Sequence, residues 1–240
     1  FANPTGPGWA NPANGRFGIY PNSESDSQLW ERDGSMEFID PTGGLETQIN
    51  CGMKIQGGSS TNDGNRSQLS IAMKFRSDSG PPELEFPMFP GSPVERFDYL
   101  LLDGGNQGSI HANVSVPQKR HAQGTHDQFM MNVHRAMGRN STRGRHVHLY
   151  LNGLYWGVYN LHERPDQDWA GAHFAGDASE YDWIKSGAVR FGNNNPVTHP
   201  SAPGVWNIIK DIELNGLDET DVYDGKPAYA ALQDYLDLDD

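Results

Sequence analysis

The sequence predicts an α+β fold, in which an antiparallel sheet is accompanied by a few packed helices. Short β-type runs separated by glycine- and proline-rich turns occupy residues 36–102, and helical periodicity first appears at residue 127. A β-hairpin follows, with strands at 147–151 and 155–161 joined by Asn152-Gly153. These two residues tolerate the positive φ angles of a type I′ turn.

Four β-type runs come first, at residues 36–39, 47–56, 69–75 and 97–102. The first two intervals contain Pro41-Thr42-Gly43-Gly44 and Gly57-Gly58-Ser59-Ser60, and Gly104-Gly105-Asn106 ends the fourth run. An antiparallel meander is the simplest arrangement of such short neighbouring strands.

The segment Asp127–Met137 has helical periodicity, because its apolar residues fall on one helix face: Phe129, Met130, Val133, Ala136 and Met137. Thr125 or Asp127 is the expected N-terminal cap, and Gly138 stands where a helix-ending glycine belongs. Three further helices are expected at 166–174, 205–214 and 228–238.

Composition limits the possible functions. The chain has 240 residues and a net charge of −13, and residues 211–240 carry −9 of it, with ten acids against Lys226 alone. This balance argues against a nucleic-acid partner. The single cysteine, Cys51, excludes an intrachain disulfide and a cysteine-built metal site. No apolar run reaches the roughly 20 residues of a membrane span.

Several segments taken in order resemble the CotH kinase family, which is named for a spore coat protein. The resemblance covers about residues 17–195. The segments that carry it are Gly18-Ile19-Tyr20, Trp30-Glu31-Arg32, Gly52–Ser60, Leu84-Glu85-Phe86-Pro87-Met88-Phe89, His148–Asp166 and Tyr181-Asp182-Trp183-Ile184-Lys185.

The resemblance implies an atypical protein serine kinase with a kinase-like two-lobed fold that uses ATP and Mg²⁺. It assigns 17–195 to the nucleotide lobe and 196–240 to an acidic helical segment that leads toward a C-lobe. Residues 1–16 are expected to be a linker from an upstream region. The family's catalytic and metal-binding aspartates would then lie beyond Asp240, so catalysis by this chain alone is not expected, and its catalytic residues stay unknown.

By the same resemblance, the cofactor-binding residues are Gly57, Gly58, Ser59, Ser60, Lys74, Glu163, Asp166 and Lys185. Backbone N–H groups of the Gly-Gly-Ser-Ser loop would face phosphate. The alternatives are that this loop is only a turn, and that Glu163 pairs with Arg164 or a neighbouring helix. Lys185 carries the same ambiguity.

The chain departs from the family pattern at four positions. Gln68 and Ala72 replace a usual lysine and arginine, and Asp103 and His126 stand where relatives usually carry arginine. Neutral or acidic replacements cannot neutralise phosphate. Lys74 or Arg66 could substitute for the lost bases. A second hypothesis is therefore a structural or adhesive surface protein with a degenerate, pseudokinase-like lobe.

Residues 111–148 hold six histidines and the one cationic stretch of the chain, with the bases Lys119, Arg120, Arg135, Arg139, Arg143 and Arg145. Surface and packing roles are favoured for the histidines over a zinc site. The bases either dock an acidic surface, such as residues 211–240 or a neighbouring copy, or form a solvated helix face. The aromatic residues Tyr150, Tyr155, Trp156 and Tyr159 are expected to pack in the core. An extracellular or cell-surface location and a protein partner are expected from the resemblance.

Overall fold

The computed structural model describes residues 10–11, 16–17, 31–44, 46–56, 68–105, 123–174, 176–181, 183–185, 188–190, 222–223 and 226–233. The chain divides into two compact units, Phe1–Gly176 and Asp177–Asp240. This division falls before residue 195, where the sequence suggested a boundary. The assignment of 1–16, 17–195 and 196–240 stays a prediction.

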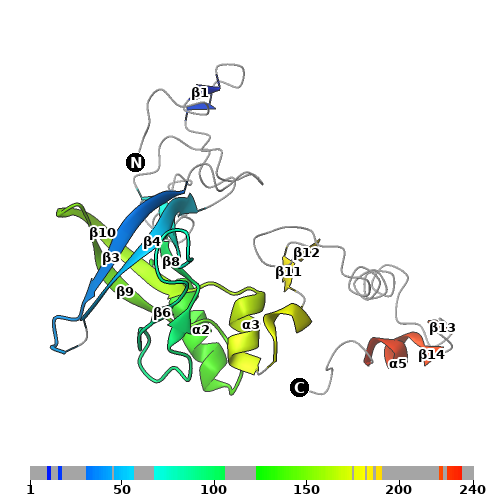
Figure 1. Cartoon of the computed structure of the whole chain (residues 1–240). Coiled ribbons are helices and arrows are strands. Elements are labelled where there is room, and N and C mark those ends of the chain that lie inside the picture. The colour runs from blue at the N-terminus through cyan, green and yellow to red at the C-terminus, as the bar shows by residue number, and fades with distance from the viewer. Residues whose placement is uncertain are drawn as a thin grey trace. The chain divides into compact units, whose positions relative to one another are not determined.

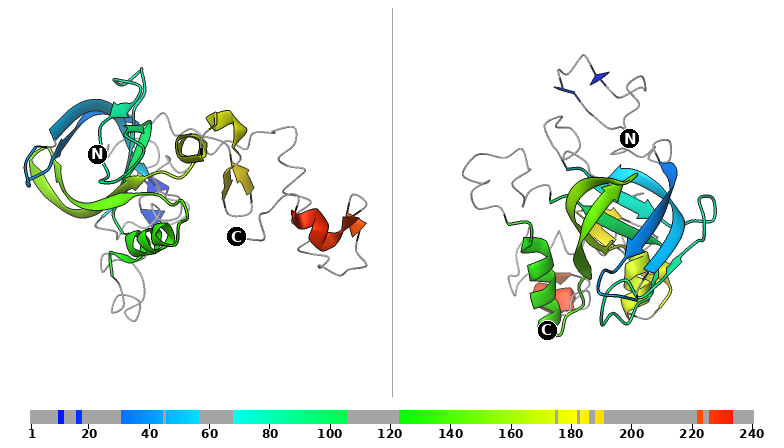
Figure 2. Two further views of the ribbon diagram at one scale, coloured as in Figure 1. Left: turned by 90° about the horizontal axis from the view of Figure 1, so that it is seen from below. Right: turned by 90° about the vertical axis from the view of Figure 1, so that its left-hand side faces the viewer.

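The first unit is built on a curled six-stranded antiparallel sheet (Figures 1 and 2). Its order is β3-β4-β5-β8-β10-β9, so the predicted antiparallel meander is confirmed for the first four strands. The bounds are β3 (Arg32–Ile39), β4 (Glu46–Gln56), β5 (Ser70–Lys74), β8 (Tyr99–Asp103), β9 (Gly144–Leu151) and β10 (Leu154–Glu163). Two short pairs accompany it, β1 (Ala10–Asn11) with β2 (Arg16–Phe17) and β6 (Leu84–Glu85) with β7 (Arg96–Phe97).

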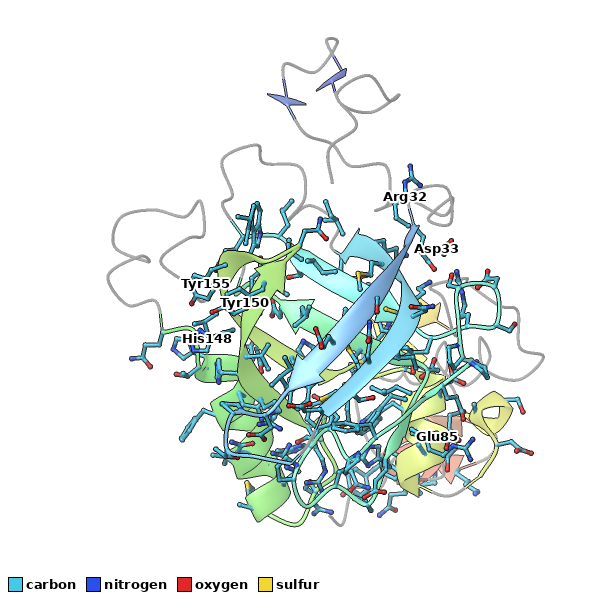
Figure 3. The ribbon with its side chains drawn as sticks, turned by 60° about the vertical axis from the view of Figure 1, so that its left-hand side comes forward. Arg32, Asp33, Glu85, His148, Tyr150 and Tyr155 are labelled. Atoms are coloured by element: carbon cyan, nitrogen blue, oxygen red, sulfur yellow. The ribbon has the colours of Figure 1, made fainter. Side chains whose placement is uncertain are left out.

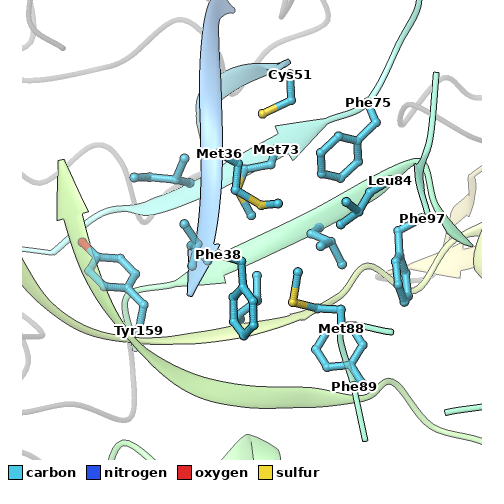
Figure 4. Packing of buried hydrophobic residues seen from close by; sticks show 14 of the residues in the cluster. Met36, Phe38, Cys51, Met73, Phe75, Leu84, Met88, Phe89, Phe97 and Tyr159 are labelled. Carbon is cyan, nitrogen blue, oxygen red and sulfur yellow. The ribbon is translucent and has the colours of Figure 1, made fainter. Parts of the chain in front are cut away.

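One face of the sheet carries the hydrophobic core (Figure 4). Alternate residues of each strand enter it, as the period of two in a strand requires. The loop between β5 and β8 closes the core with side chains such as Met88 and Phe89. The most deeply buried apolar members are Cys51, Met73, Phe75, Leu84, Met88, Leu100 and Tyr159.

The predicted hairpin of β9 and β10 is confirmed. Asn152 has φ of 50° and Gly153 has φ of 80°, which are the left-handed conformations that a type I′ turn needs. Leu151 pairs with Leu154 across this turn. The ladder shifts by one residue between Tyr155 and Gly157, where β10 has a bulge.

Within its described residues this unit has the helices α2 (His126–Ala136) and α3 (Gln167–Phe174). Gly138 ends α2 with φ of 84° and donates its N–H to the carbonyl of Arg135, as expected. Thr125 is the N-cap residue of α2, but its side chain makes no capping hydrogen bond.

The second unit contains a short 3₁₀ helix (Ala178–Glu180), the pairs β11 (Trp183–Lys185) with β12 (Ala188–Arg190) and β13 (Val222–Tyr223) with β14 (Lys226–Pro227), and α5 (Ala228–Gln233). The helix expected at 205–214 lies outside the described residues. Within the described parts of the chain, no helix is both long and apolar enough to span a membrane.

The expected core packing of the hairpin aromatics is wrong for three of the four. Tyr159 is buried, but Tyr150, Tyr155 and Trp156 are 47% exposed or more. Tyr150 lies on the same face of β9 as the exposed His146 and His148, opposite the core-facing Val147, Leu149 and Leu151, and Tyr155 pairs with Tyr150 on that face. There Tyr150 and Tyr155 contact each other, and His148 Nδ1 lies 3.0 Å from the Tyr155 hydroxyl (Figure 3).

Candidate functional site

The face of the sheet opposite the core is polar, and it gathers cationic side chains from neighbouring strands. Register places Lys74 of β5 between Gly52 of β4 and Tyr99 of β8. Lys54 lies across from Ala72 on the same face, because it is two residues from Gly52. The polar face is defined here by Glu31, Lys54, Lys74, Arg76, Tyr99 and Arg164.

Both lysines of the polar face are buried, with 8% of Lys54 and 4% of Lys74 exposed. The ammonium of Lys74 lies 4.0 Å from the carboxylate of Glu31, which also accepts a hydrogen bond from the guanidinium of Arg76. The side chain of Glu31 is also buried, with 6% of it exposed. A single carboxylate therefore lies among several cations.

Tyr99 forms the floor beneath two of these cations. The Arg164 guanidinium carbon lies 4.4 Å from the centre of the Tyr99 ring, and the Lys74 nitrogen lies 5.5 Å from it. Such cation–π contacts hold the positive groups without neutralising them. The Tyr99 hydroxyl donates a 3.0 Å hydrogen bond to Gln56 Oε1, which fixes the ring.

The two buried lysines of the polar face have lowered pKa values. Burial and then the nearby charge of Lys74 lower the pKa of Lys54 to about 8, although Glu31 acts in the opposite direction. Burial also lowers the pKa of Lys74, and Arg76 and Arg164 add to this against Glu31. Burial raises the pKa of Tyr99 to about 12. The cations of this face thus disfavour one another's charged forms.

Gly52 is needed for this arrangement. A Cβ atom at position 52 would lie 2.7 Å from the carboxyl carbon of Glu31, which is closer than real Cβ contacts allow. Glycine therefore gives the Glu31 carboxylate its place beside Lys74 and Arg76. The requirement is steric rather than conformational, since this glycine lies within a regular strand.

A small pocket adjoins the polar face between the start of β8 and helix α3, and Asp98, Arg164, Asp168 and Trp169 are among its lining residues. Burial, followed by the charges of Asp166 and Asp168, raises the pKa of Asp98 to about 7. Burial also raises the pKa of Asp166 and of Asp168. Arg164, 3.5 Å from Asp166, is the cation that opposes these shifts.

Glu163 connects β10 to two other segments. It is 2% exposed, and its Oε2 accepts hydrogen bonds from the backbone N–H of Arg143 at 2.6 Å and the indole N–H of Trp169 at 3.1 Å. Its Oε1 lies 3.0 Å from Nε2 of His173. Both oxygens thus contact the protein, which agrees with the alternative that Glu163 pairs with a neighbouring helix.

Asp166 caps helix α3, since its Oδ1 accepts the backbone N–H of Trp169 at 3.2 Å. Among the other predicted cofactor-binding residues, Lys74 lies at the centre of the polar face. Lys185 lies on β11 of the second unit. Gly57, Gly58, Ser59 and Ser60, and Arg66, lie outside the described residues. The cofactor-binding role of all these residues stays a prediction.

Sequence reasoning missed Lys54, Tyr99 and Arg164 as members of this face. For Lys54 the available signal was its place in β4, where a charged residue lies between the apolar Met53 and Ile55. That Lys54 lies close to Lys74 follows from the pairing register of β4 and β5, which the sequence pattern does not give. Of the residues that depart from the family pattern, Ala72 lies on the polar face across from Lys54. Asp103 accepts hydrogen bonds from Ser70 Oγ and the Gly105 N–H, and His126 is exposed at the start of α2.

No three His, Cys, Asp or Glu side chains come together as metal ligands in the described ranges. His146 and His148 lie on one face of β9 and are exposed. His146 Nε2 lies 3.1 Å from the Gly124 carbonyl oxygen. These observations agree with surface roles for these two histidines.

The fold and site define the first unit as an α+β lobe whose antiparallel sheet carries a core on one face and buried cations on the other. The model of the CotH kinase protein family matches residues 125–239. The match confirms the resemblance over this segment, which contains the motifs His148–Asp166 and Tyr181-Asp182-Trp183-Ile184-Lys185, and the chain is CotH-like there. The segment contains Glu163, Arg164 and Asp166, while Lys54 and Lys74 precede it. No curated protein matches the chain.

Proposed function

We propose that the polar face binds the phosphate groups of a nucleoside triphosphate, and that the chain supplies the nucleotide-binding lobe of a CotH-like protein serine kinase. The observation that carries this proposal is the surplus of buried positive charge. Lys54 and Lys74 are buried beside the one carboxylate of Glu31, while Arg76 and Arg164 of the face have further partners in Asp78 and Asp166.

Buried ammonium groups are costly unless an anion compensates them. Glu31 contacts Arg76 and Lys74, whereas at Lys54 burial lowers the pKa, and the repulsion from the charge of Lys74 adds to this because it outweighs the attraction of Glu31. A polyphosphate would relieve this like-charge repulsion, and it would favour the protonated form of both lysines. Lys54 and Lys74 are therefore the residues proposed to hold phosphate, with Arg164 beside them.

ATP, when bound, would supply the phosphoryl group. This chain's own residues bind and orient its charge: the lysines attract the phosphates, Glu31 keeps Lys74 in place, and the Tyr99 ring supports Lys74 and Arg164. The described residues fit a phosphate cradle. They do not offer a set of three metal ligands, so no step of this proposal depends on Mg²⁺.

The test is calorimetric titration of the chain with ATP, with and without Mg²⁺. We expect saturable binding that Lys74→Met weakens by about tenfold or more, since one charged hydrogen bond is lost. Lys226→Met is the matched control, because it removes the same charge from an exposed position. Absence of binding at millimolar ATP, or equal affinities of both variants, would contradict the proposal.

The second candidate is a structural or adhesive surface protein with a degenerate lobe. Asp103 favours it, because this acid replaces a usual arginine and is occupied with bonds to Ser70 and Gly105. The same titration separates the two candidates, since the structural one requires no nucleotide. An extracellular or cell-surface location is part of either proposal.

A further inference from the structure

Helix α2 turns its apolar stripe away from the sheet. The exposed fractions are 63% for Phe129, 60% for Met130 and 70% for Met137, and Val133 lies between them on the same face. Burying such side chains is the usual function of an amphipathic helix. The outer side of α2 is therefore an apolar surface, here called the α2 stripe, on the outside of the curled sheet (Figure 2).

The opposite side of α2 is held in place by polar contacts. Gln128 is the buried residue of the helix, and it packs beside Gly144 of β9. The Arg135 guanidinium donates a 2.7 Å hydrogen bond to the Thr142 carbonyl, and the Ser141 hydroxyl donates one of 2.7 Å to the Met131 carbonyl. The helix is thus preformed, and it presents the α2 stripe without needing to reorganise.

The stripe has the spacing of a helix-pair interface. His126, Met130, Val133 and Met137 follow one another at intervals of four, three and four residues, which is the alternation of core positions in a coiled coil. Asp127 and His134 both flank this seam on the same side, seven residues apart. In an antiparallel pair related by a two-fold axis, the same flanks meet, so Asp127 of each helix faces His134 of the other.

We propose that the α2 stripe packs against the α2 stripe of a second copy, as an antiparallel, isologous helix pair. Met130 and Val133 meet the same residues of the other copy at the centre of the seam, His126 and Met137 lie at its ends, and two equivalent Asp127–His134 pairs border it. The helix dipoles also oppose each other favourably in this orientation. This self-complementarity of apolar area and charge selects a second copy over an unrelated partner.

The size of the stripe sets the strength of the association. A helix of 11 residues is about 16 Å long, and such a pair covers less than the roughly 800 Å² per partner of a standard stable interface. The dimer is therefore a weak one, with a Kd of roughly 10 to 100 µM. It forms and dissociates with concentration.

The test is sedimentation equilibrium of the full chain from about 1 to 300 µM, where micromolar dimers are resolved. We expect a reversible monomer–dimer equilibrium, which Met137→Glu weakens by at least about tenfold because it places charge in the seam. Leu154→Glu is the control. It places the same charge at the exposed hairpin turn and leaves the dimer unchanged. Circular dichroism establishes that each variant is folded.

A charge exchange tests the orientation of the pair. Asp127→Lys weakens the dimer, and Asp127→Lys combined with His134→Asp restores it, because each new lysine then faces an aspartate of the other copy. A chain that is monomeric at 300 µM, about the top of the range, overturns the proposal. So does a dimer that is insensitive to Met137→Glu, or an exchange that fails to restore association.

Discussion

At the scale of single residues, Lys54 shows how a buried charge can serve binding at the expense of stability. Burial and the neighbouring Lys74 lower its pKa from 10.5 to about 8. Between these values the folded chain holds fewer protons at this site than the unfolded chain, so stability rises with pH. Below pH 8 the charged ammonium destabilises the fold.

We therefore expect the melting temperature of the wild-type chain, relative to Lys54→Met, to rise between about pH 7.5 and pH 9.5. At neutral pH, Lys54→Met should be more stable than wild type, because methionine fills the site without a buried charge. Thermal denaturation at both pH values measures this, with Lys226→Met as the control. A pH-independent difference between wild type and Lys54→Met would contradict the depressed pKa.

The same substitution should weaken ATP binding if the polar face holds phosphate. Stability and binding would then change in opposite directions, which simple misfolding cannot produce. A substitution that raises stability and lowers ATP affinity indicates that the residue serves binding.

Some of the polar face could be predicted from the sequence, and some could not. Lys74 was identified because it lies close to the positions where the family's bases are missing. Tyr99 and Arg164 come from segments far from Lys74 in the chain, and only the pairing of β5 with β8 and the position of Arg164 after β10 bring them together. Side-chain partners across a sheet depend on register, which local sequence patterns do not fix.

At the scale of elements, Glu163 joins β10, the segment before β9 and helix α3. Its partners are the Arg143 N–H, the Trp169 indole and His173. Removing the carboxylate would leave buried donors without an acceptor, which is costlier than losing the bonds alone. We infer that this residue sets the position of α3 against the end of the sheet.

Glu163→Ala should accordingly lower the free energy of unfolding by about 3 kcal/mol. Urea denaturation measures it, and Glu37→Ala provides a matched change at an exposed strand position. A variant as stable as wild type that no longer binds ATP would instead support the cofactor-binding role implied by the resemblance.

Element boundaries followed from local chemistry where a turn specified them. Asn152-Gly153 and Gly138 adopt positive φ as their residue types predict. The packing of the elements did not follow in the same way. The hairpin aromatics were expected in the core, yet Tyr150 and its partner Tyr155 lie on the face of the hairpin that carries the exposed His146 and His148. Which face of the hairpin meets the core is decided by segments that are far away in sequence.

At the scale of the whole molecule, net charge opposes both proposed associations. The chain carries −13, so a second copy and a polyphosphate are each repelled at long range. Local structure must overcome this repulsion, through the apolar α2 stripe in one case and the buried cations in the other. Salt weakens the attraction between buried cations and a polyphosphate, whereas it leaves the apolar contact of the α2 stripe unchanged.

Raising ionic strength from about 10 to 150 mM shortens the Debye length from about 30 to 8 Å. We expect the α2 dimer to become tighter over this range, because screening removes the repulsion between two acidic chains while the apolar seam is unaffected. The bordering Asp127–His134 pairs are exposed, and they set the orientation of the two helices more than the strength of the dimer. Sedimentation equilibrium at several salt concentrations measures this. A dimer that weakens steadily with salt would show that ionic contacts hold it, and the apolar stripe would then not be its basis.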